Sequence, residues 1–86
     1  MDEHKLHDNA KAFVVKDGAH LHSLKDLYGH LNTITDAHFN HHVNAERNDF
    51  ADWVEHALGD KFLAMAMRQT RTKDDMRKAV FISMFK

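Results

Sequence analysis

Near the start of the chain, apolar and polar positions alternate in a way that predicts a small β-hairpin. Residues 13–15 (FVV) form a short run of strand-favouring side chains, and residues 19–22 (AHLH) alternate apolar with polar positions. Asp17 and Gly18 lie between the two runs, where an Asp-Gly pair favours a tight turn. Strands as short as these are not stable alone in water, so we expect the hairpin to pack on helices.

Beyond the hairpin, the apolar positions change to the period of an α-helix and predict five short helices. In the first helix, Leu24, Leu27 and Leu31 lie on one face, and Ser23 can cap the N-terminus. The expected helices run over about residues 24–32, 36–43, 49–58, 60–69 and from 72 onward. Thr35, Asn48 and Thr72 are the expected caps of three later helices, Asp60 begins the fourth, and Gly59 can close the third.

The composition is that of an ordinary globular domain. Of the 86 residues, 43% are hydrophobic and 29% are charged, and there is neither proline nor cysteine. The lack of cysteine excludes disulfides, thiolate nucleophiles and zinc or iron–sulfur sites built on cysteine. The expected fold is mainly α: a small helical bundle of about five short helices with an N-terminal β-hairpin, formed by residues 12–86 after a flexible lead-in of residues 1–11.

The apolar stretches are too short for a membrane span. The longest, FLAMAM and AVFISMF, fall well below the about 20 residues that a transmembrane helix requires. The first residues, MDEHKLHDNAK, are polar throughout and do not have the pattern of a signal peptide. We therefore expect a cytoplasmic protein that does not enter the membrane.

Charge is divided unevenly along the chain. Residues 1–60 carry five Lys/Arg and eleven Asp/Glu, whereas residues 61–86 carry seven and two, so the two parts have net charges of −6 and +5. In the basic part, Arg68, Arg71 and Lys78 could share an exposed side and bind nucleic acid. The acidic part would repel phosphate, so the pattern supports weak nucleic-acid binding at most.

A histidine-rich stretch, HFNHHVNAERNDFADW, covers residues 38–53 and contains one pattern that suits a metal ion. His38, His42 and Glu46 are four residues apart, so on one continuous helix they would share a face and could bind zinc or nickel. Against this hypothesis, the stretch lacks an HExxH motif, and the helix can end before Glu46. The alternative is that these histidines are solvated or cap helices.

No catalytic signature is present in the sequence. There is no serine or threonine in the setting of an activated nucleophile and no glycine-rich phosphate loop. A bundle of this size also has little room for the pocket that would desolvate an acid/base pair. We therefore expect no enzymatic activity and no required cofactor.

The C-terminal run AVFISMFK is apolar around nearly the whole circumference of a helix. A helix at the edge of a small domain buries only one stripe, which leaves Phe81, Ile82 and Phe85 outside the core. An apolar group left over after folding favours an interaction surface for a protein partner or for a second copy of the chain. The alternative is that the last turn packs under the hairpin.

The histidine-rich stretch also has a purely structural interpretation, as the corner between two helices. One helix must stop after Val43 and another must begin near Asp49, and the free amides and carbonyls between them need partners. Asn44 suits a helix end, Asn48 suits a cap, and His42 can hydrogen-bond across the turn. The residues of this corner are Phe39, His42, Asn44, Asn48, Asp49, Phe50 and Trp53.

These residues also resemble a known family. The patterns F-x-x-H-V-N at residues 39–44 and N-D-F-A-x-W-V at residues 48–54 are similar to the small prokaryotic domain of unknown function called DUF5752, and the resemblance covers about residues 12–80. The family has no established activity and occurs alone or as an appendage of larger proteins, which implies an accessory or interaction domain. His42 falls on the motif, whereas the motif is permissive at His38, His41 and His56, which weakens the metal hypothesis. The expected function is a non-catalytic protein-interaction module, with histidine-based metal binding and weak nucleic-acid binding as alternatives.

Overall fold

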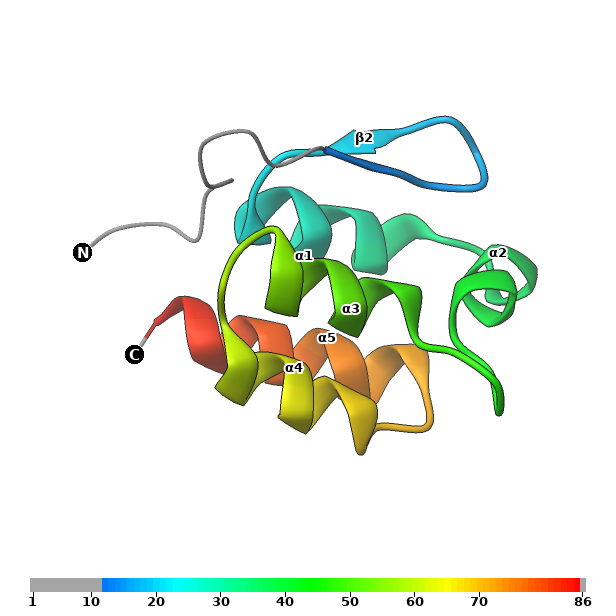
Figure 1. The fold of residues 1–86 in the computed structure, drawn as a ribbon. Coiled ribbons are helices and arrows are strands. Elements are labelled where there is room, and N and C mark those ends of the chain that lie inside the picture. Colours follow the sequence, from blue (N-terminus) through cyan, green and yellow to red (C-terminus); the bar gives the residue numbers. More distant parts are fainter. Residues whose placement is uncertain (1–11, 86) are drawn as a thin grey trace.

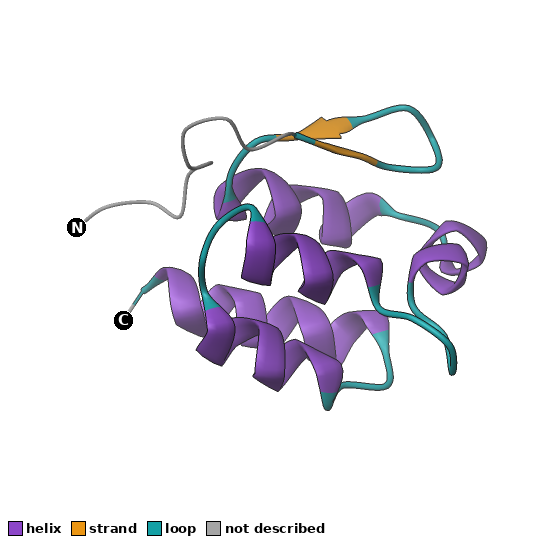
Figure 2. Ribbon diagram, viewed as in Figure 1, coloured by secondary structure: helices purple, strands orange, loops and turns teal. Residues whose placement is uncertain are grey.

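The computed structural model describes residues 12–85, and within this range the chain forms two short strands and five helices (Figures 1 and 2). The elements are β1 (Phe13–Val14), β2 (His20–Leu21), α1 (Leu24–Thr33), α2 (Asp36–His42), α3 (Asp49–His56), α4 (Lys61–Arg68) and α5 (Lys73–Met84). This architecture confirms the expected fold class of a small helical bundle with an N-terminal hairpin. The predicted lead-in of residues 1–11 lies outside the described residues. None of the helices in the described range has the length and apolar character needed to cross a membrane.

The hairpin turns at the Asp-Gly pair, as its sequence predicts. Phe13 pairs with Leu21 and Val14 with His20 in an antiparallel register. Gly18 has a φ of 94°, which a residue with a side chain rarely adopts, and the backbone N–H of Ala19 donates to an Asp17 carboxylate oxygen at 3.0 Å. The paired strands are only two residues long each, shorter than predicted.

Each of the five helices in the described range begins directly after a side chain that caps it. The capping oxygen accepts a backbone N–H from three residues further along, at 2.9 to 3.2 Å. The caps are Ser23, Thr35, Asn48, Asp60 and Thr72. At the other end of α3, Gly59 has the positive φ of 73° that is typical of a residue following a helix, although α3 itself ends two residues earlier than predicted.

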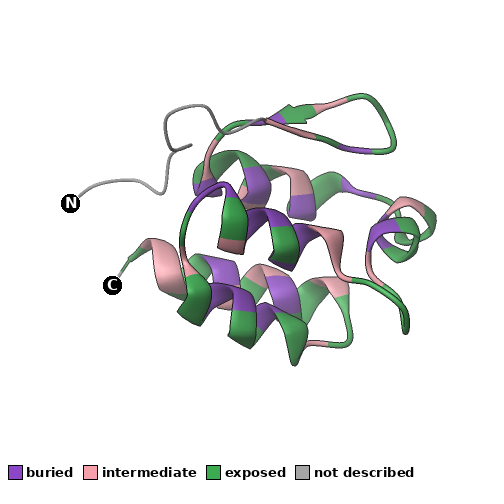
Figure 3. Cartoon of the chain, viewed as in Figure 1, coloured by how far each residue is buried: buried purple, intermediate pink, exposed green. Residues whose placement is uncertain are grey.

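A single core lies between the helices. Helix α1 packs on α5, α3 packs on α4, and α4 packs on α5, while the hairpin covers α1 and α2 lies at one end of the bundle (Figure 1). Buried positions follow the inner faces of the helices (Figure 3). The largest fully buried side chains are Leu24, Leu27, Leu31, Phe50, Val54, Met67, Met76 and Val80.

Candidate functional site

His42 lies at the centre of the corner between α2 and α3, with only 6% of its surface exposed. Its Nε2 accepts the backbone N–H of Lys16 from the hairpin at 2.9 Å, and its Nδ1 lies 2.9 Å from a carboxylate oxygen of Asp49. Because a backbone N–H can only donate, Nε2 carries no proton, and the proton on Nδ1 is donated to Asp49. The neutral ring therefore uses both nitrogens on partners within the protein, and neither is free for a metal ion or a substrate.

Aromatic rings surround His42 on the core side. The ring of Phe13 meets that of His42 edge to face with 5.2 Å between centroids, and the ring of Phe50 lies 5.3 Å from His42. Phe39 stacks on Phe50 at 6.2 Å, and Trp53 lies 6.0 Å from Phe13. The hairpin thus contributes Phe13 to a cluster that joins α2 to α3.

The loop from residue 43 to 48 is held by its own polar side chains. The side chain of Asn44 accepts the N–H of Glu46 at 2.9 Å through Oδ1 and donates to the carbonyl of Asn40 at 3.1 Å through Nδ2. Arg47 donates from Nε to the carbonyl of His41 at 3.1 Å. These bonds satisfy carbonyl groups in the last turn of α2, which a helix end otherwise leaves without partners.

Asn48 connects the corner to a further helix. Its Oδ1 caps α3 by accepting the N–H of Ala51 at 3.0 Å, and its Nδ2 donates to the carbonyl of Met67 in α4 at 3.4 Å. Together with Lys16 and Phe13, Met67 is a member of this corner that sequence reasoning missed. These residues lie far from positions 39–53 in the sequence. Lys16 and Met67 bond to the corner only through backbone groups, so no local pattern of side chains indicates them.

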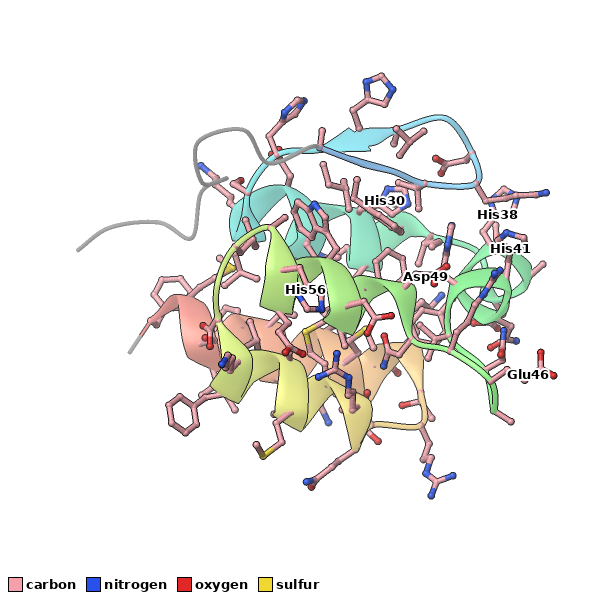
Figure 4. The ribbon with its side chains drawn as sticks, viewed as in Figure 1. His30, His38, His41, Glu46, Asp49 and His56 are labelled. Atoms are coloured by element: carbon pink, nitrogen blue, oxygen red, sulfur yellow. The ribbon has the colours of Figure 1, made fainter. Side chains whose placement is uncertain are left out.

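The predicted metal ligands are not assembled into a site. Helix α2 ends at His42, so Glu46 lies in the following loop and leaves the helical spacing that the hypothesis requires. Figure 4 shows Glu46 on the outer end of this loop, apart from His38. Residues 12–85 contain no group of three or more histidine, aspartate or glutamate side chains placed to hold a metal ion. The neighbouring His41 is exposed, and its pKa is lowered by partial desolvation and then by the positive charges of Lys16 and Arg47.

The predicted basic side is divided between two places. Arg68 donates to Asp52 and lies within 2.7 Å of Glu55, and these two hydrogen-bonded carboxylates raise the pKa of Arg68. Arg68 and Arg71 line an open polar depression of about 790 Å³ beside the loop of residues 43–48. Lys78 lines a different depression, between α1 and α5. Among the described residues, Arg68, Arg71 and Lys78 therefore do not share the one exposed side that the sequence suggested.

The most prominent exposed feature is apolar. Phe81, Ile82 and Phe85 at the end of α5 are 47%, 59% and 71% exposed, and Phe62 and Met65 on α4 are 86% and 56% exposed. We call these five residues the α4–α5 apolar surface. The sequence predicts that Phe62 and Met65 belong to the fourth helix, but it does not indicate that they lie outside the buried face of that helix.

Most of the α4–α5 apolar surface lies toward one end of the bundle, whereas Met65 is in the middle of α4. Helices α4 and α5 pack side by side and run in opposite directions, so the start of α4 lies beside the end of α5 (Figure 1). This places Phe62 at the same end as Ile82 and Phe85. The rings of Phe81 and Phe85 lie 4.8 Å apart. The end of α5 does not pack under the hairpin, which lies on the opposite side of α1.

No family model matches the chain, and no curated protein or solved structure is similar enough to it to count as a match. The resemblance to DUF5752 therefore stays a prediction.

Proposed function

We propose that this protein is a non-catalytic protein-interaction domain that binds its partner through the α4–α5 apolar surface. The observation that carries this proposal is the exposure of bulky side chains on two adjacent helices. Each phenylalanine or isoleucine that a partner covers can contribute about 1.5–3 kcal/mol of transfer free energy before the costs of association. The surface has four such side chains, and Met65 adds a fifth exposed apolar group.

Single exposed apolar residues are ordinary on protein surfaces, so their distribution is what matters. Within the described residues, six large hydrophobic side chains are exposed, and five of them belong to the α4–α5 apolar surface; the sixth is Val14 in the hairpin. The polar side chains of the corner, in contrast, are occupied by bonds within the protein.

Removing the side chains of the surface without disturbing the core tests this proposal. A variant with Phe81→Ser, Ile82→Ser and Phe85→Ser keeps the buried Met76 and Val80, whereas truncation before Val80 would remove part of the core. We expect the wild type to self-associate in light scattering or to retain a cross-linked partner from its native cell, and the triple variant to do neither.

Val14→Ser is the matched control, because Val14 is 58% exposed but lies on the hairpin. It should behave as the wild type does in both measurements. If the triple variant folds and still forms the same complexes as the wild type, the proposed surface is incorrect.

A further inference from the structure

We infer that the groove between α1 and α5 binds an amphipathic helix of a partner protein that carries acidic side chains along the edges of its apolar face. This inference rests on the proposed function, because Phe81 and Ile82 belong both to the groove and to the α4–α5 apolar surface. The groove has a volume of about 400 Å³ and is lined by Tyr28, Arg77, Lys78, Phe81 and Ile82.

Helices α1 and α5 run in opposite directions along the groove. Arg77 donates to the Asn32 side chain at 3.1 Å near one end, and the rings of Tyr28 and Phe81 lie 5.5 Å apart one turn further along. The next ring in the row is that of Phe85, 4.8 Å from Phe81. A row of apolar side chains along the line where two helices meet can receive the residues that an amphipathic helix presents at the spacing i, i+3 or i+4, i+7.

A glycine follows Tyr28 on α1, at an exposed position outside the lining of the groove. Gly29 lies within the helix, one residue after Tyr28, and a Cβ atom added to it would meet nothing within 4 Å. Glycine lowers the stability of a helix interior relative to alanine, and internal packing does not require it here. The absence of a side chain leaves the outer surface of α1 next to Tyr28 open, so a helix seated in the groove can extend over α1 without meeting a side chain at position 29.

The charges beside the groove indicate which charge the partner should carry. Lys25 lies one turn before Tyr28 and Gly29 on the same flank of α1, and Lys78 lies on α5 across the groove. Neither lysine has an ion-pair or hydrogen-bond partner among residues 12–85. At one end of the groove, a carboxylate oxygen of Asp74 lies 3.6 Å from a guanidinium nitrogen of Arg77.

Two lysines that have no partner among residues 12–85 and lie beside an apolar row favour carboxylates on the partner. A second copy of this chain is less suitable, because a two-fold contact would place this basic groove against itself. The chemistry therefore specifies a different protein as the occupant, with glutamate or aspartate flanking its leucine-type anchors.

A synthetic peptide can test the inference directly. The probe is a fluorescently labelled helix of about 18 residues with leucine at the anchor positions and glutamate on both flanks. The matched peptide has lysine at every glutamate position. We expect the acidic peptide to bind the full chain in fluorescence polarisation, the basic peptide to bind about tenfold or more weakly, and added salt to reduce the difference. Amide shifts in NMR spectra should concentrate on α1 and α5.

Two sets of variants locate the binding. Gly29→Leu should leave the thermal midpoint unchanged or raise it, because leucine is the better helix former, yet weaken peptide binding by about tenfold or more by filling the open surface beside Tyr28. Lys25→Glu combined with Lys78→Glu should reverse the preference between the two peptides. Lys16→Glu combined with Arg71→Glu makes the same change in net charge outside the groove and should preserve the preference.

Absence of binding by the acidic peptide, equal binding of both peptides, or unchanged binding by a folded Gly29→Leu variant would each overturn the inference. The proposed function would survive these results if the triple serine variant still lost its association. Self-association of the wild type that Phe85→Ser abolishes, with no peptide binding, would instead identify a second copy as the occupant. Complexes that are unaffected by the triple variant would refute both proposals.

Discussion

At the scale of single residues, His42 connects three segments that are separate in the chain. It belongs to α2, donates to Asp49 at the start of α3, and accepts from the backbone of the hairpin at Lys16. The two bonds require one donor and one acceptor on the same buried ring, and neutral imidazole supplies this combination.

We expect His42→Ala to lower the free energy of unfolding by about 2–4 kcal/mol, since it removes a packed ring and leaves the amide of Lys16 without its acceptor. Urea denaturation measures this change. His41→Ala is the matched control, because the adjacent ring is exposed and its loss should cost about 0.5 kcal/mol or less. An equal decrease in the free energy of unfolding of the two variants would mean that the buried hydrogen bonds do not stabilise the corner.

The residue types of the corner could be predicted from the sequence, but their partners could not. Asn48 before a helix and His42 at the end of another indicate hydrogen bonding from their chemistry and position. The amide of Lys16 is 26 positions from His42, and the carbonyl of Met67 is 19 positions from Asn48. Backbone groups are present at every such position, so only the tertiary fold selects which of them is used.

At the scale of elements, the helices were predictable because each has a side-chain cap and most have one apolar stripe. Helix α4 and the C-terminal part of α5 are the exceptions. The α4 sequence KFLAMAMR is apolar at six of eight positions, so spacing alone does not identify the buried face. Packing against α3 and α5 selects Leu63, Ala64 and Met67, and leaves Phe62 and Met65 exposed.

Two adjacent residues of α4 provide a test of this assignment. Leu63→Ala should destabilise the protein by about 2–4 kcal/mol, because it opens a cavity in the core, whereas Phe62→Ala should change stability by about 0.5 kcal/mol or less. Thermal or urea unfolding of both variants shows which face of α4 is buried. A larger loss for Phe62→Ala would show that the helix is rotated relative to the arrangement described.

At the scale of the whole molecule, the hairpin is part of the core and not an attachment to it. Val15 and Leu21 are buried, Phe13 packs against His42 and Phe50, and Nε2 of His30 on α1 lies 3.5 Å from a carboxylate oxygen of Asp17 in the turn. A two-stranded hairpin has little stability alone, so its strands depend on these contacts. The sequence predicted that the hairpin packs on helices, but not which helices receive it.

We therefore expect the hairpin and the helices to unfold in one transition. The single tryptophan, Trp53, lies 6.0 Å from Phe13, so its fluorescence reports on the contact between the hairpin and α3. Far-ultraviolet circular dichroism reports on the helices. The two signals should share one midpoint in urea, and a fluorescence transition at clearly lower urea would indicate that the hairpin opens first.

The contact between Lys16 and His42 also affects how tolerance to mutation should be understood in this protein. Lys16 takes part through its backbone N–H, which every amino acid except proline possesses. Position 16 can therefore vary in sequence while the bond is kept, whereas position 42 cannot. Among related chains, position 16 would look freely variable. Only the absence of proline there would reveal that the backbone N–H at this position matters.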